Sequence, residues 1–348
     1  MSNDLSSIPQ TAQQTAQEAE QAVTNPIADS QSLPQVQQLQ DWMNSQIIGQ
    51  PDLVERLMIA LLADGHLLVE GPPGLAKTKA VKTLSDGIEG DFHRIQFTPD
   101  LLPSDVTGTD IYRPENGSFE FQPGPIFHNL VLADEINRAP AKVQSALLEA
   151  MAERQISVGR STYPLPDLFM VMATQNPIEQ EGTYPLPEAQ LDRFLMHVPV
   201  NYPDASAEAE VLRLVRNEAA AAPVSEPKKI SKATLQEARQ SVLTIHMAPA
   251  VEEYIVQLII ATRQPEKYSS ELASFLEFGA SPRGTISLDR CARAHAWLNG
   301  QDFVTPDDVQ KVIHDVLRHR IILSFEAEAS GVTPDDVINQ LVNVVPVA

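Results

Sequence analysis

Three short apolar runs, with helical stretches between them, limit how this chain of 348 residues can fold. The runs are HLLVEG at 66–71, LVLAD at 130–134 and LFMVMATQN at 168–176. Continuous apolar strands that alternate with helices are typical of a parallel sheet whose two faces are both covered. We therefore expect an α/β domain with a parallel sheet that ends near Pro203.

The chain beyond Pro203 has the pattern of helices throughout. Stretches such as VEEYIVQLIIATR and ISLDRCARAHAWLNG carry apolar residues at helical spacing. The hexapeptide VTPDDV, at 304–309 and again at 332–337, places a threonine N-cap before a proline and two aspartates, which is typical of a helix start. The predicted organisation is a disordered N-terminal tail (1–35), an α/β core (36–203) and an all-α lid (204–348).

The formal net charge of −21 and the pI near 4.7 limit the partners of this chain. Affinity for nucleic-acid phosphates and anionic lipid is mostly electrostatic, so we expect no nucleic-acid binding and no membrane insertion. No apolar stretch approaches the roughly 18 residues that span a bilayer, and no signal peptide is visible. The single cysteine, Cys291, is interpreted as a small buried apolar side chain. The expected location is the cytoplasm.

The first apolar run leads into GPPGLAKT at 71–78, which departs at one position from the phosphate-binding pattern Gly-x-x-x-x-Gly-Lys-Thr. In that pattern backbone N–H groups close around phosphate oxygens, Lys77 reaches the terminal phosphates, and the Thr78 hydroxyl holds Mg²⁺. Ala76 stands where the pattern has glycine. A methyl group is excluded there only if φ is positive or the backbone must approach another group closely. The alternative is an ordinary strand–turn–helix connection.

Two acidic residues and an amide follow the other two apolar runs. Asp134 ends LVLAD, Glu135 comes directly after it, and Asn176 ends LFMVMATQN. Open parallel sheets bind ligands at the carboxyl ends of their strands. One carboxylate there can hold Mg²⁺, a second can polarise the attacking water, and an amide can orient that water or contact the γ-phosphate. The alternatives are that the acids cap the next helix and that Asn176 is a turn residue before Pro177.

Arg193, in PEAQLDRF, is a candidate for contact with phosphate. An arginine that projects into the site of a neighbouring subunit stabilises the charge of phosphoryl transfer, a role worth roughly 10³- to 10⁵-fold in rate. The alternative is an ion pair on the surface with Asp192 or Glu188. The sequence by itself leaves both interpretations open.

Arg283, in GASPRGTISL, occupies an unfavourable position for a positive charge. Ser281 is an expected N-cap, so Arg283 falls in the first turn of a helix. The helix dipole disfavours a cation there by roughly 0.3–1 kcal/mol, which suggests that an anion meets it. The alternative is a local partner such as Glu277 or Asp289.

With these elements in this order, the sequence resembles the AAA+ ATPases and, within them, closely resembles the MoxR family. The resemblance covers about residues 36 to 345. It implies that GPPGLAKT is the Walker A motif, in which alanine before the lysine is a familiar form, and that LVLADE is the Walker B motif. The implied nucleotide-binding residues are Ile48, Gly49 and Gln50 near adenine, Gly71, Pro72, Pro73, Gly74, Leu75, Ala76, Lys77 and Thr78 around the phosphates, and Asp134, which with Thr78 would hold Mg²⁺.

The same resemblance implies the roles of the remaining candidates. Glu135 would activate water, Asn176 matches sensor 1, and Arg193 matches the arginine finger. Arg283 matches sensor 2. The segment DIYRPENGSFEFQPGPIF resembles the helix-2 insert of the family, and RQISVGRSTYPLP resembles the hairpin before sensor 1. A fold of AAA+ P-loop NTPase type, with a parallel-sheet core and a helical lid, follows from the resemblance.

The resemblance also implies what the protein does. It implies a Mg²⁺-dependent ATPase, with ATP and Mg²⁺ as cofactors, that assembles as a homo-oligomeric ring, expected as a hexamer. The ring would remodel or mature protein complexes like a chaperone, with a von Willebrand factor A domain protein and a client enzyme complex as partners. The alternatives are a nucleotide-gated scaffold without turnover, a DNA-acting AAA+ motor and a chelatase-type motor subunit for metal insertion. The intact Glu135, Asn176 and Arg193 argue against the scaffold, and the acidic net charge argues against the DNA motor.

Overall fold

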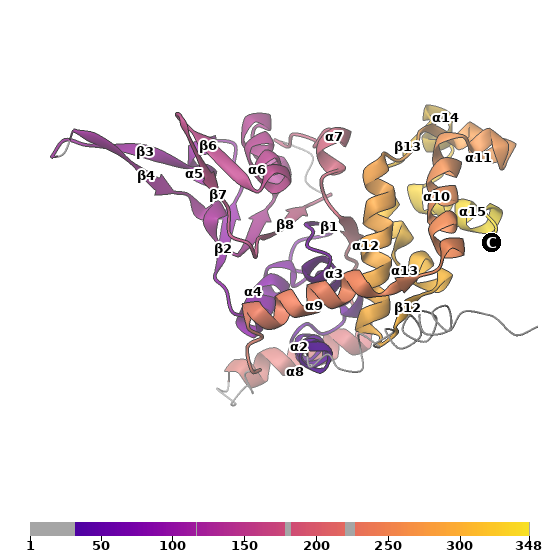
Figure 1. The fold of residues 1–348 in the computed structure, drawn as a ribbon, viewed down its shortest axis with the longest axis horizontal. Coiled ribbons are helices and arrows are strands. Elements are labelled where there is room, and N and C mark those ends of the chain that lie inside the picture. The colour runs from indigo at the N-terminus through magenta and orange to yellow at the C-terminus, as the bar shows by residue number, and fades with distance from the viewer. Residues whose placement is uncertain (1–31, 116, 178–181, 220–226, 348) are drawn as a thin grey trace, which may run out of the picture.

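A five-stranded parallel sheet forms the centre of the first half of the chain in this computed structural model, which describes residues 32–115, 117–177, 182–219 and 227–347 (Figure 1). The strand order is β2-β5-β8-β1-β9. The strands are β1 (Leu67–Glu70), β2 (Phe92–Gln96), β5 (Leu130–Asp134), β8 (Met170–Gln175) and β9 (Met196–Pro199). The three apolar runs form β1, β5 and β8, so the predicted parallel α/β core is confirmed.

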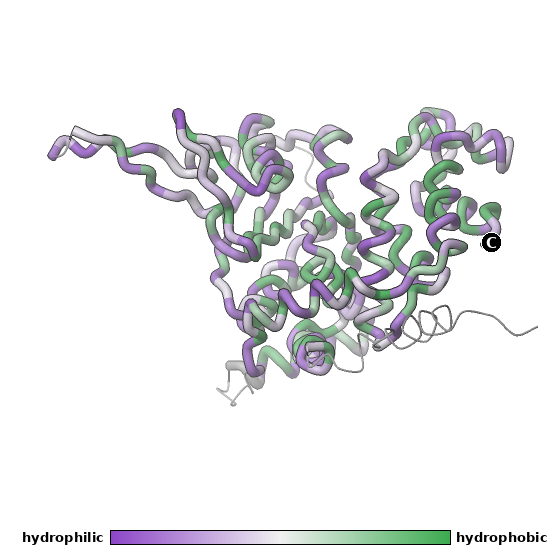
Figure 2. The backbone as a smooth tube through the Cα atoms, viewed as in Figure 1, coloured by the Kyte–Doolittle hydropathy of each residue, from purple (hydrophilic) through white to green (hydrophobic). Residues whose placement is uncertain are grey.

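The sheet is buried on both faces, because residues that alternate along a strand enter two separate hydrophobic clusters. Leu67 and Val69 belong to one cluster, and Leu68 belongs to the other. The helices on the first face are α2 (Ser32–Gln46), α3 (Pro51–Leu62) and α4 (Lys77–Gly87), and those on the second are α5 (Pro103–Thr107) and α6 (Ala141–Glu153). Figure 2 shows the hydrophobic stretches running through these strands and helices. A ligand can therefore reach the sheet only at its edges.

The hydrophobic pattern of the sequence does not predict two of the strands, β2 and β9. β2 lies at the edge of the sheet and buries only Ile95 of its five residues, so it has no continuous apolar run. β9 has four residues and follows a helical turn, α7 (Glu188–Leu191). Both strands are held by parallel pairing to a neighbour, β2 to β5 and β9 to β1. Their backbone hydrogen bonds, rather than a local apolar pattern, place them in the sheet.

Two antiparallel hairpins extend from the core in the segments predicted as the insert and as the hairpin before sensor 1. β3 (Gly108–Arg113) pairs with β4 (Ser118–Pro123), and β6 (Gln155–Val158) pairs with β7 (Ser161–Pro164). The rings of Phe121 and Tyr163 stack with their centroids 3.9 Å apart. This contact joins the two hairpins, while the outer end of β3–β4 reaches far from the lid (Figure 1).

The second half of the chain is mostly helical and includes the lid. Its helices are α8 (Ala205–Ala219), α9 (Lys232–Thr244), α10 (Pro249–Arg263), α11 (Ser270–Phe275), α12 (Pro282–Leu298), α13 (Pro306–Leu317), α14 (Phe325–Ala329) and α15 (Pro334–Val344). Both copies of VTPDDV begin helices as predicted, since Thr305 accepts a hydrogen bond from the Asp308 backbone and Thr333 from that of Asp336. Cys291 is fully buried, as expected, and burial raises the pKa of its thiol to about 12.

The lid departs from the all-α prediction in two places. The strand β10 (His246–Met247) pairs with β12 (Phe303–Val304), and β11 (Leu276–Phe278) pairs with β13 (Ile322–Leu323). Strands of two or three residues bury too few side chains to leave a period in the sequence. None of the helices in the described ranges is long and apolar enough to cross a membrane.

The N-terminal boundary also differs from the prediction. Helix α2 begins at Ser32, inside the 1–35 segment assigned to the disordered tail, because Leu33 and Val36 are buried on its inner face. Residues 1–31 of that predicted tail lie outside the described residues. Gln37 in α2 donates a hydrogen bond of 2.8 Å to the Leu298 carbonyl, so this helix also contacts the lid. The division of core and lid at Pro203 stays a prediction.

One buried arginine ties the lid to the core. The Arg320 side chain is 1% exposed, and its Nε lies 2.9 Å from Asp192 Oδ1. Its Nη atoms donate to the carbonyls of Phe194 (2.6 Å) and Leu195 (3.1 Å), and to Ser287 Oγ (3.2 Å) on α12. A single guanidinium thus satisfies backbone groups at the start of β9 and fixes the lid against them.

We expect the change Arg320→Met to destabilise the protein by about 3–5 kcal/mol, since it leaves buried carbonyls and a carboxylate without their partner. Denaturant unfolding followed by fluorescence gives the free energy of unfolding. The matched control is Arg113→Met, because Arg113 pairs with Glu120 but is 51% exposed. We expect that control to change stability by no more than about 0.5 kcal/mol. Equal losses in the two variants would show that the Arg320 contacts do not hold the lid.

Candidate nucleotide-binding site

The parallel register lines up polar side chains in one row at the carboxyl edge of the sheet. Gln96 on β2 lies opposite Asp134 on β5, and Val69 on β1 lies opposite Thr174 on β8. Thr174 Oγ1 donates a hydrogen bond of 2.5 Å to Asp134 Oδ1, which joins β8 to β5 in the same row. The loop after β1 closes over this row. Parallel sheets bind ligands at this edge, where the strand order reverses.

A cavity of about 410 Å³ lies between the loop and this row of side chains. It is lined by Pro73, Gly74, Leu75, Ala76, Lys77, Thr78, Lys79, Arg94, Asp134, Glu135 and Asn176. The structure therefore brings most of the predicted phosphate-loop residues together with both acids and the amide. Arg94 and Lys79 are additional members that the sequence analysis does not single out.

The two glycines of the loop are required for different reasons. A Cβ at Gly71 would lie 2.5 Å from the carbonyl oxygen of Val200, the residue directly after β9, so this close approach excludes a side chain. Gly74 has open space around it but a φ of +85°, a conformation that L-residues rarely adopt. The first glycine thus permits packing of the loop against the sheet, and the second permits the turn.

Ala76 adopts the left-handed conformation, with φ +57° and ψ +12°, directly before α4. The condition under which a methyl group is disfavoured at this position is therefore met. Left-handed backbone costs an alanine roughly 1–2 kcal/mol. The surrounding contacts hold the loop in this shape, and the backbone of Ala76 begins α4 by accepting a hydrogen bond of 2.8 Å from Ala80. The alanine strains the loop without changing its course.

Lys77 spans the loop and satisfies backbone carbonyls. Its Nζ donates to the Gly71 carbonyl at 2.6 Å and lies 3.4 Å from that of Gln175. Burial lowers the pKa of this ammonium group, and the nearby Asp134 and Glu135 carboxylates oppose that shift. A partly desolvated lysine beside a ring of backbone N–H groups is suited to bind a polyanion, because phosphate oxygens restore the solvation that it lacks.

The two adjacent acids have separate partners. Asp134 is held through Oδ1 by Thr174 and through Oδ2 by Arg94, at 3.0 and 2.6 Å. Glu135 turns into the left-handed region, with φ +57° and ψ +50°, and its carboxylate accepts hydrogen bonds from Gln96 (2.8 Å) and Arg138 (3.1 Å). The turn points the second carboxylate along a different direction from the first. Neither acid caps α6, whose N-terminal residue follows Pro140.

The chemistry of the cavity fits a nucleoside triphosphate with a divalent cation. Thr78 and Asp134 supply hard oxygen ligands of the kind that Mg²⁺ prefers, and Lys77 faces the same space. Asn176 is 5% exposed at the end of β8, where its amide lines this cavity. The positive φ of Gly74, which lines the cavity, gives the loop the turn that this site requires.

The segment predicted near adenine lies beside the loop but outside the cavity lining. Gln50 Nε2 donates to the Asn201 carbonyl at 2.8 Å, and Gly49, with a φ of +78°, packs closely against Pro203. Val200, between these contacts and the sheet, donates its N–H to the Glu70 carbonyl at 2.7 Å. The 48–50 segment is thereby held next to the end of β9, which adjoins the phosphate loop. Its contact with adenine stays a prediction.

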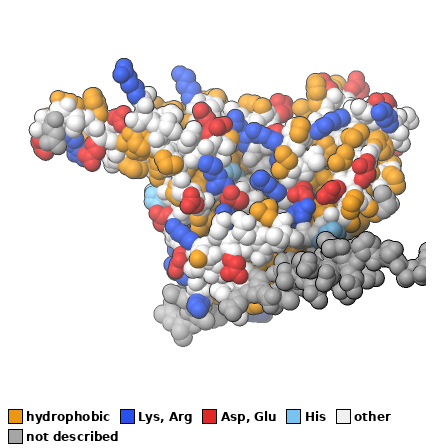
Figure 3. Space-filling model, in the orientation of Figure 1, with side chains coloured by type: hydrophobic (Ala, Val, Ile, Leu, Met, Phe, Trp, Pro, Cys, Tyr) orange, Lys and Arg blue, Asp and Glu red, His pale blue; other side chains and the backbone are white. Residues whose placement is uncertain are grey.

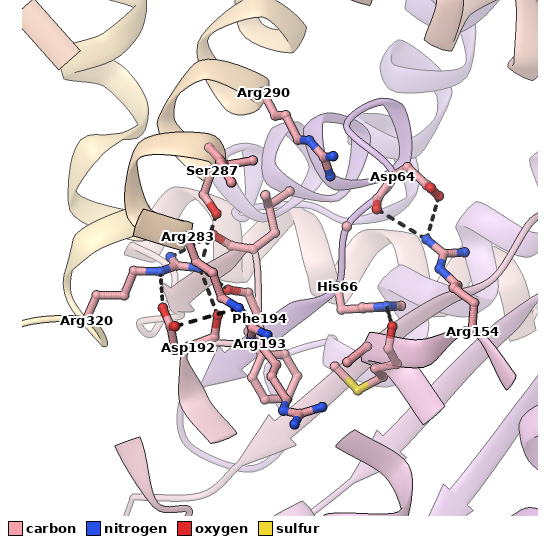
Figure 4. Close-up of a pocket in the computed structure, with 15 residues that line it drawn as sticks. Asp64, His66, Arg154, Asp192, Arg193, Phe194, Arg283, Ser287, Arg290 and Arg320 are labelled. Atoms are coloured by element: carbon pink, nitrogen blue, oxygen red, sulfur yellow. Dashed lines mark hydrogen bonds and ion pairs between the residues drawn. The ribbon is translucent and has the colours of Figure 1, made fainter. Parts of the chain in front are cut away.

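The two candidate arginines meet in a second cavity of about 320 Å³, between the core and α12 (Figure 4). Arg193 donates to the Leu148 carbonyl at 2.8 Å, and Arg283 is 50% exposed with its Nε 4.0 Å from Asp192 Oδ2. No residue lines both this cavity and the phosphate-loop cavity. Neither arginine therefore lines the phosphate-loop cavity of its own subunit, and the roles of Arg193 and Arg283 toward phosphate stay predictions.

Basic side chains gather around this second cavity. Figure 3 shows Lys and Arg side chains collected in the middle of one face, between the hairpin-bearing core and the lid. The cavity is lined by Arg154, Arg193, Arg283, Arg290 and Arg320, together with Asp64 and Asp192 among other residues. In a chain with a net charge of −21, this concentration of arginine marks a surface suited to an anion.

Comparison with known proteins decides the family. Residues 66–196 match the ATPase family associated with various cellular activities (AAA), and residues 270–341 match the AAA lid domain. Chaperone MoxR1 of Mycobacterium tuberculosis is 47% identical over 300 residues, which are 86% of this chain and 78% of the relative. Protein MoxR of Methylorubrum extorquens is 33% identical, over 83% of this chain and 88% of the relative. The chain belongs to the MoxR family of AAA+ ATPases.

A solved structure agrees with this assignment. A protein from Cytophaga hutchinsonii, whose crystal structure was determined at 2.00 Å resolution, is 44% identical and matches with a TM-score of 0.85. The match covers 95% of this chain and 99% of that protein. The MoxR family and the AAA+ fold with its lid, both expected from the motifs, are thus confirmed, and nucleotide binding is what this family implies.

Residues that the sequence analysis missed come from the edge strand. Arg94 and Gln96 on β2 reach Asp134 and Glu135. Two polar residues separated by one position on a strand share a face. The segment FHRIQ therefore shows that Arg94 and Gln96 point to the same side if it forms a strand. That they reach the two acids follows only from the pairing of β2 with β5.

Two substitutions in the loop should change stability in opposite directions. Ala76→Gly relieves left-handed strain and should raise the free energy of unfolding by about 1 kcal/mol with nucleotide affinity retained. Gly71→Ala drives a methyl group against Val200 and should cost about 1–3 kcal/mol and weaken nucleotide binding. Chemical denaturation and titration with a fluorescent ATP analogue give both quantities. A destabilising Ala76→Gly would contradict the backbone conformation described here.

Proposed function

We propose that this protein hydrolyses ATP with Mg²⁺ and uses the energy to remodel partner protein complexes. The observation that carries the proposal is the meeting of Lys77, Asp134 and Glu135 in one cavity at the carboxyl edge of the sheet. A binding-only site needs the lysine and the loop. A hydrolytic site also needs a second carboxylate to act on the attacking water, and Glu135 is placed in the cavity as such a carboxylate.

Each residue of the cavity has a role that its position supports. Lys77 and the loop N–H groups bind and orient the phosphates. Thr78 and Asp134 would hold Mg²⁺, which when bound neutralises charge on the phosphate oxygens. Glu135 accepts a proton from the attacking water or orients it, and the Asn176 amide donates a hydrogen bond to that water or to the γ-phosphate.

The second cavity supports assembly into a ring. Arg193 and Arg283 line a cavity that shares no lining residue with the phosphate-loop cavity, and we infer that they meet the nucleotide of a neighbour. Head-to-tail contacts of this kind close into rings, and the resemblance to the family favours a hexamer. Cations from a second subunit would then complete each catalytic site at the moment of phosphoryl transfer.

A chain of contacts supports transfer of nucleotide state to the lid. Glu70, the residue before Gly71, pairs with His197 at 2.8 Å. Arg318, at the end of α13 in the lid, donates to the His197 carbonyl at 2.6 Å and pairs with Asp335 at 2.9 Å. A shift of the phosphate loop therefore acts on a lid side chain through a single intervening residue. Lid movement of this kind is the mechanical output that remodelling requires.

The proposed partners rest on the family resemblance rather than on a surface of this chain. They are a von Willebrand factor A domain protein and a client enzyme complex. A chelatase-type role in metal insertion and a scaffold without turnover are the competing interpretations. The intact Glu135 in the cavity favours turnover over the scaffold.

The first test is steady-state phosphate release with Mg²⁺ across a series of protein concentrations. We expect specific activity to rise with concentration, because residues from two subunits complete each site. Glu135→Gln should bind ATP and lose about 10²- to 10⁴-fold in turnover, the usual worth of a general base. Ala76→Gly serves as the control for substitution within the same cavity. If assembled wild-type protein binds ATP but is no faster than Glu135→Gln, the scaffold interpretation holds instead.

Mixing two inactive variants tests the role of the neighbour. Arg193→Ala retains Glu135, and Glu135→Gln retains Arg193, so some interfaces in mixed rings regain a complete site. At equal amounts and with random assembly, about a quarter of the sites should be complete. Each variant alone serves as the control, with size-exclusion chromatography to verify assembly. Mixed rings that stay as inactive as their parts would exclude an action of Arg193 across the interface.

A further inference from the structure

Arg94 makes a close ion pair in the phosphate-loop cavity. Its Nε and Nη2 lie 3.0 and 2.6 Å from Asp134 Oδ2, and Nη2 also donates to Gln96 Oε1 at 2.7 Å. The other Asp134 oxygen accepts from Thr174 at 2.5 Å. Both oxygens of the carboxylate that is expected to hold Mg²⁺ are therefore engaged by the protein itself.

The two members of this pair differ in exposure. The Asp134 side chain is 13% exposed, whereas that of Arg94 is 48% exposed. The carboxylate is fixed in the sheet, at the end of the fully buried strand β5, and the guanidinium can turn away toward solvent or into the cavity. A half-exposed cation on a buried anion is the arrangement of an exchangeable counter-ion.

The charges that line the cavity favour such an exchange. Three cations, Lys77, Lys79 and Arg94, and two carboxylates, Asp134 and Glu135, face the same space. A divalent cation that enters without phosphates meets three positive charges and finds its carboxylate occupied. The phosphates of ATP reverse the balance, since they attract the guanidinium, for which bidentate contact with phosphate is favourable.

We propose that Arg94 is a positioning residue that blocks the metal-binding carboxylate of Asp134 until a nucleotide arrives, and that then contacts the phosphates. This inference rests on the proposed function of the same cavity. It gives Arg94 two effects of opposite sign. The contact with Asp134 weakens binding of the metal alone, and the positive charge strengthens binding of metal-free ATP. The result is that metal and nucleotide enter together.

The test measures binding rather than turnover, in the full-length protein with Arg94→Met. Mn²⁺, as a paramagnetic probe for the metal, is titrated into nucleotide-free protein, and a fluorescent ATP analogue is titrated in the presence of EDTA. We expect Mn²⁺ to bind about tenfold more tightly than to wild type, and metal-free nucleotide to bind about tenfold more weakly, as befits one charge-assisted contact. Arg113→Met, an equally exposed arginine of the hairpin, is the matched control and should change neither affinity.

Two further variants make the result decisive. Adding Asp134→Asn to Arg94→Met should abolish the gain in Mn²⁺ affinity, which locates the metal at Asp134. Arg94→Lys keeps the charge without the two-pronged contact and should fall between wild type and Arg94→Met. If Arg94→Met leaves Mn²⁺ affinity unchanged, or weakens both ligands together, the proposal is wrong and Arg94 is only structural. If the wild-type protein binds no nucleotide at all, the proposed function itself fails. This result differs from a failure of the Arg94 proposal, in which the wild-type protein still binds nucleotide.

Discussion

The parallel register of the central sheet is the constraint on which the site depends. Because both faces are covered by helices, the sheet offers ligands only its edges. Pairing of β2, β5, β8 and β1 brings Gln96, Asp134 and Thr174 into one row, although these residues lie far apart in the chain. A slip of β5 by one residue would turn the carboxylate of Asp134 to the opposite face of the sheet. The relative positions of these side chains are thus set by the backbone hydrogen bonds between the strands.

Local signals were enough to predict much of this arrangement. The apolar runs predicted the strands β1, β5 and β8, and the threonine N-caps predicted the starts of α13 and α15. The glycine-rich loop and the acids Asp134 and Glu135 predicted the residues that line the cavity. What the sequence left open depends on contacts between distant segments. The edge strand β2, and with it Arg94, is defined by pairing with β5 rather than by its own pattern. The backbone angle of Ala76 and the separation of Arg193 from the phosphate-loop cavity likewise follow from tertiary packing.

The cavity as described is satisfied by its own residues. Lys77 is bound to backbone carbonyls, Asp134 to Arg94, and Glu135 to Gln96. These three charged groups therefore each have a partner within the protein. Such internal pairing prevents an unliganded site from carrying bare buried charges, and it makes binding an exchange of partners rather than the filling of a vacant space. The surrounding structure holds Ala76 and Glu135, on either side of this cavity, in left-handed backbone conformations that cost free energy.

The Asp192 carboxylate contacts residues of the lid through both of its oxygens. One oxygen of its carboxylate holds the buried Arg320, while the other accepts from Ser281 at 2.8 Å and faces Arg283 at 4.0 Å. The same residue directly precedes Arg193 in the chain. The Asp192 carboxylate thus connects Arg320, which holds the lid to the core, with the arginine-lined cavity. Because the cavity takes Arg154 and Arg193 from the core and Arg283 and Arg290 from α12, a tilt of the lid would change the spacing of its arginines, and the surface offered to a neighbour would depend on the position of the lid.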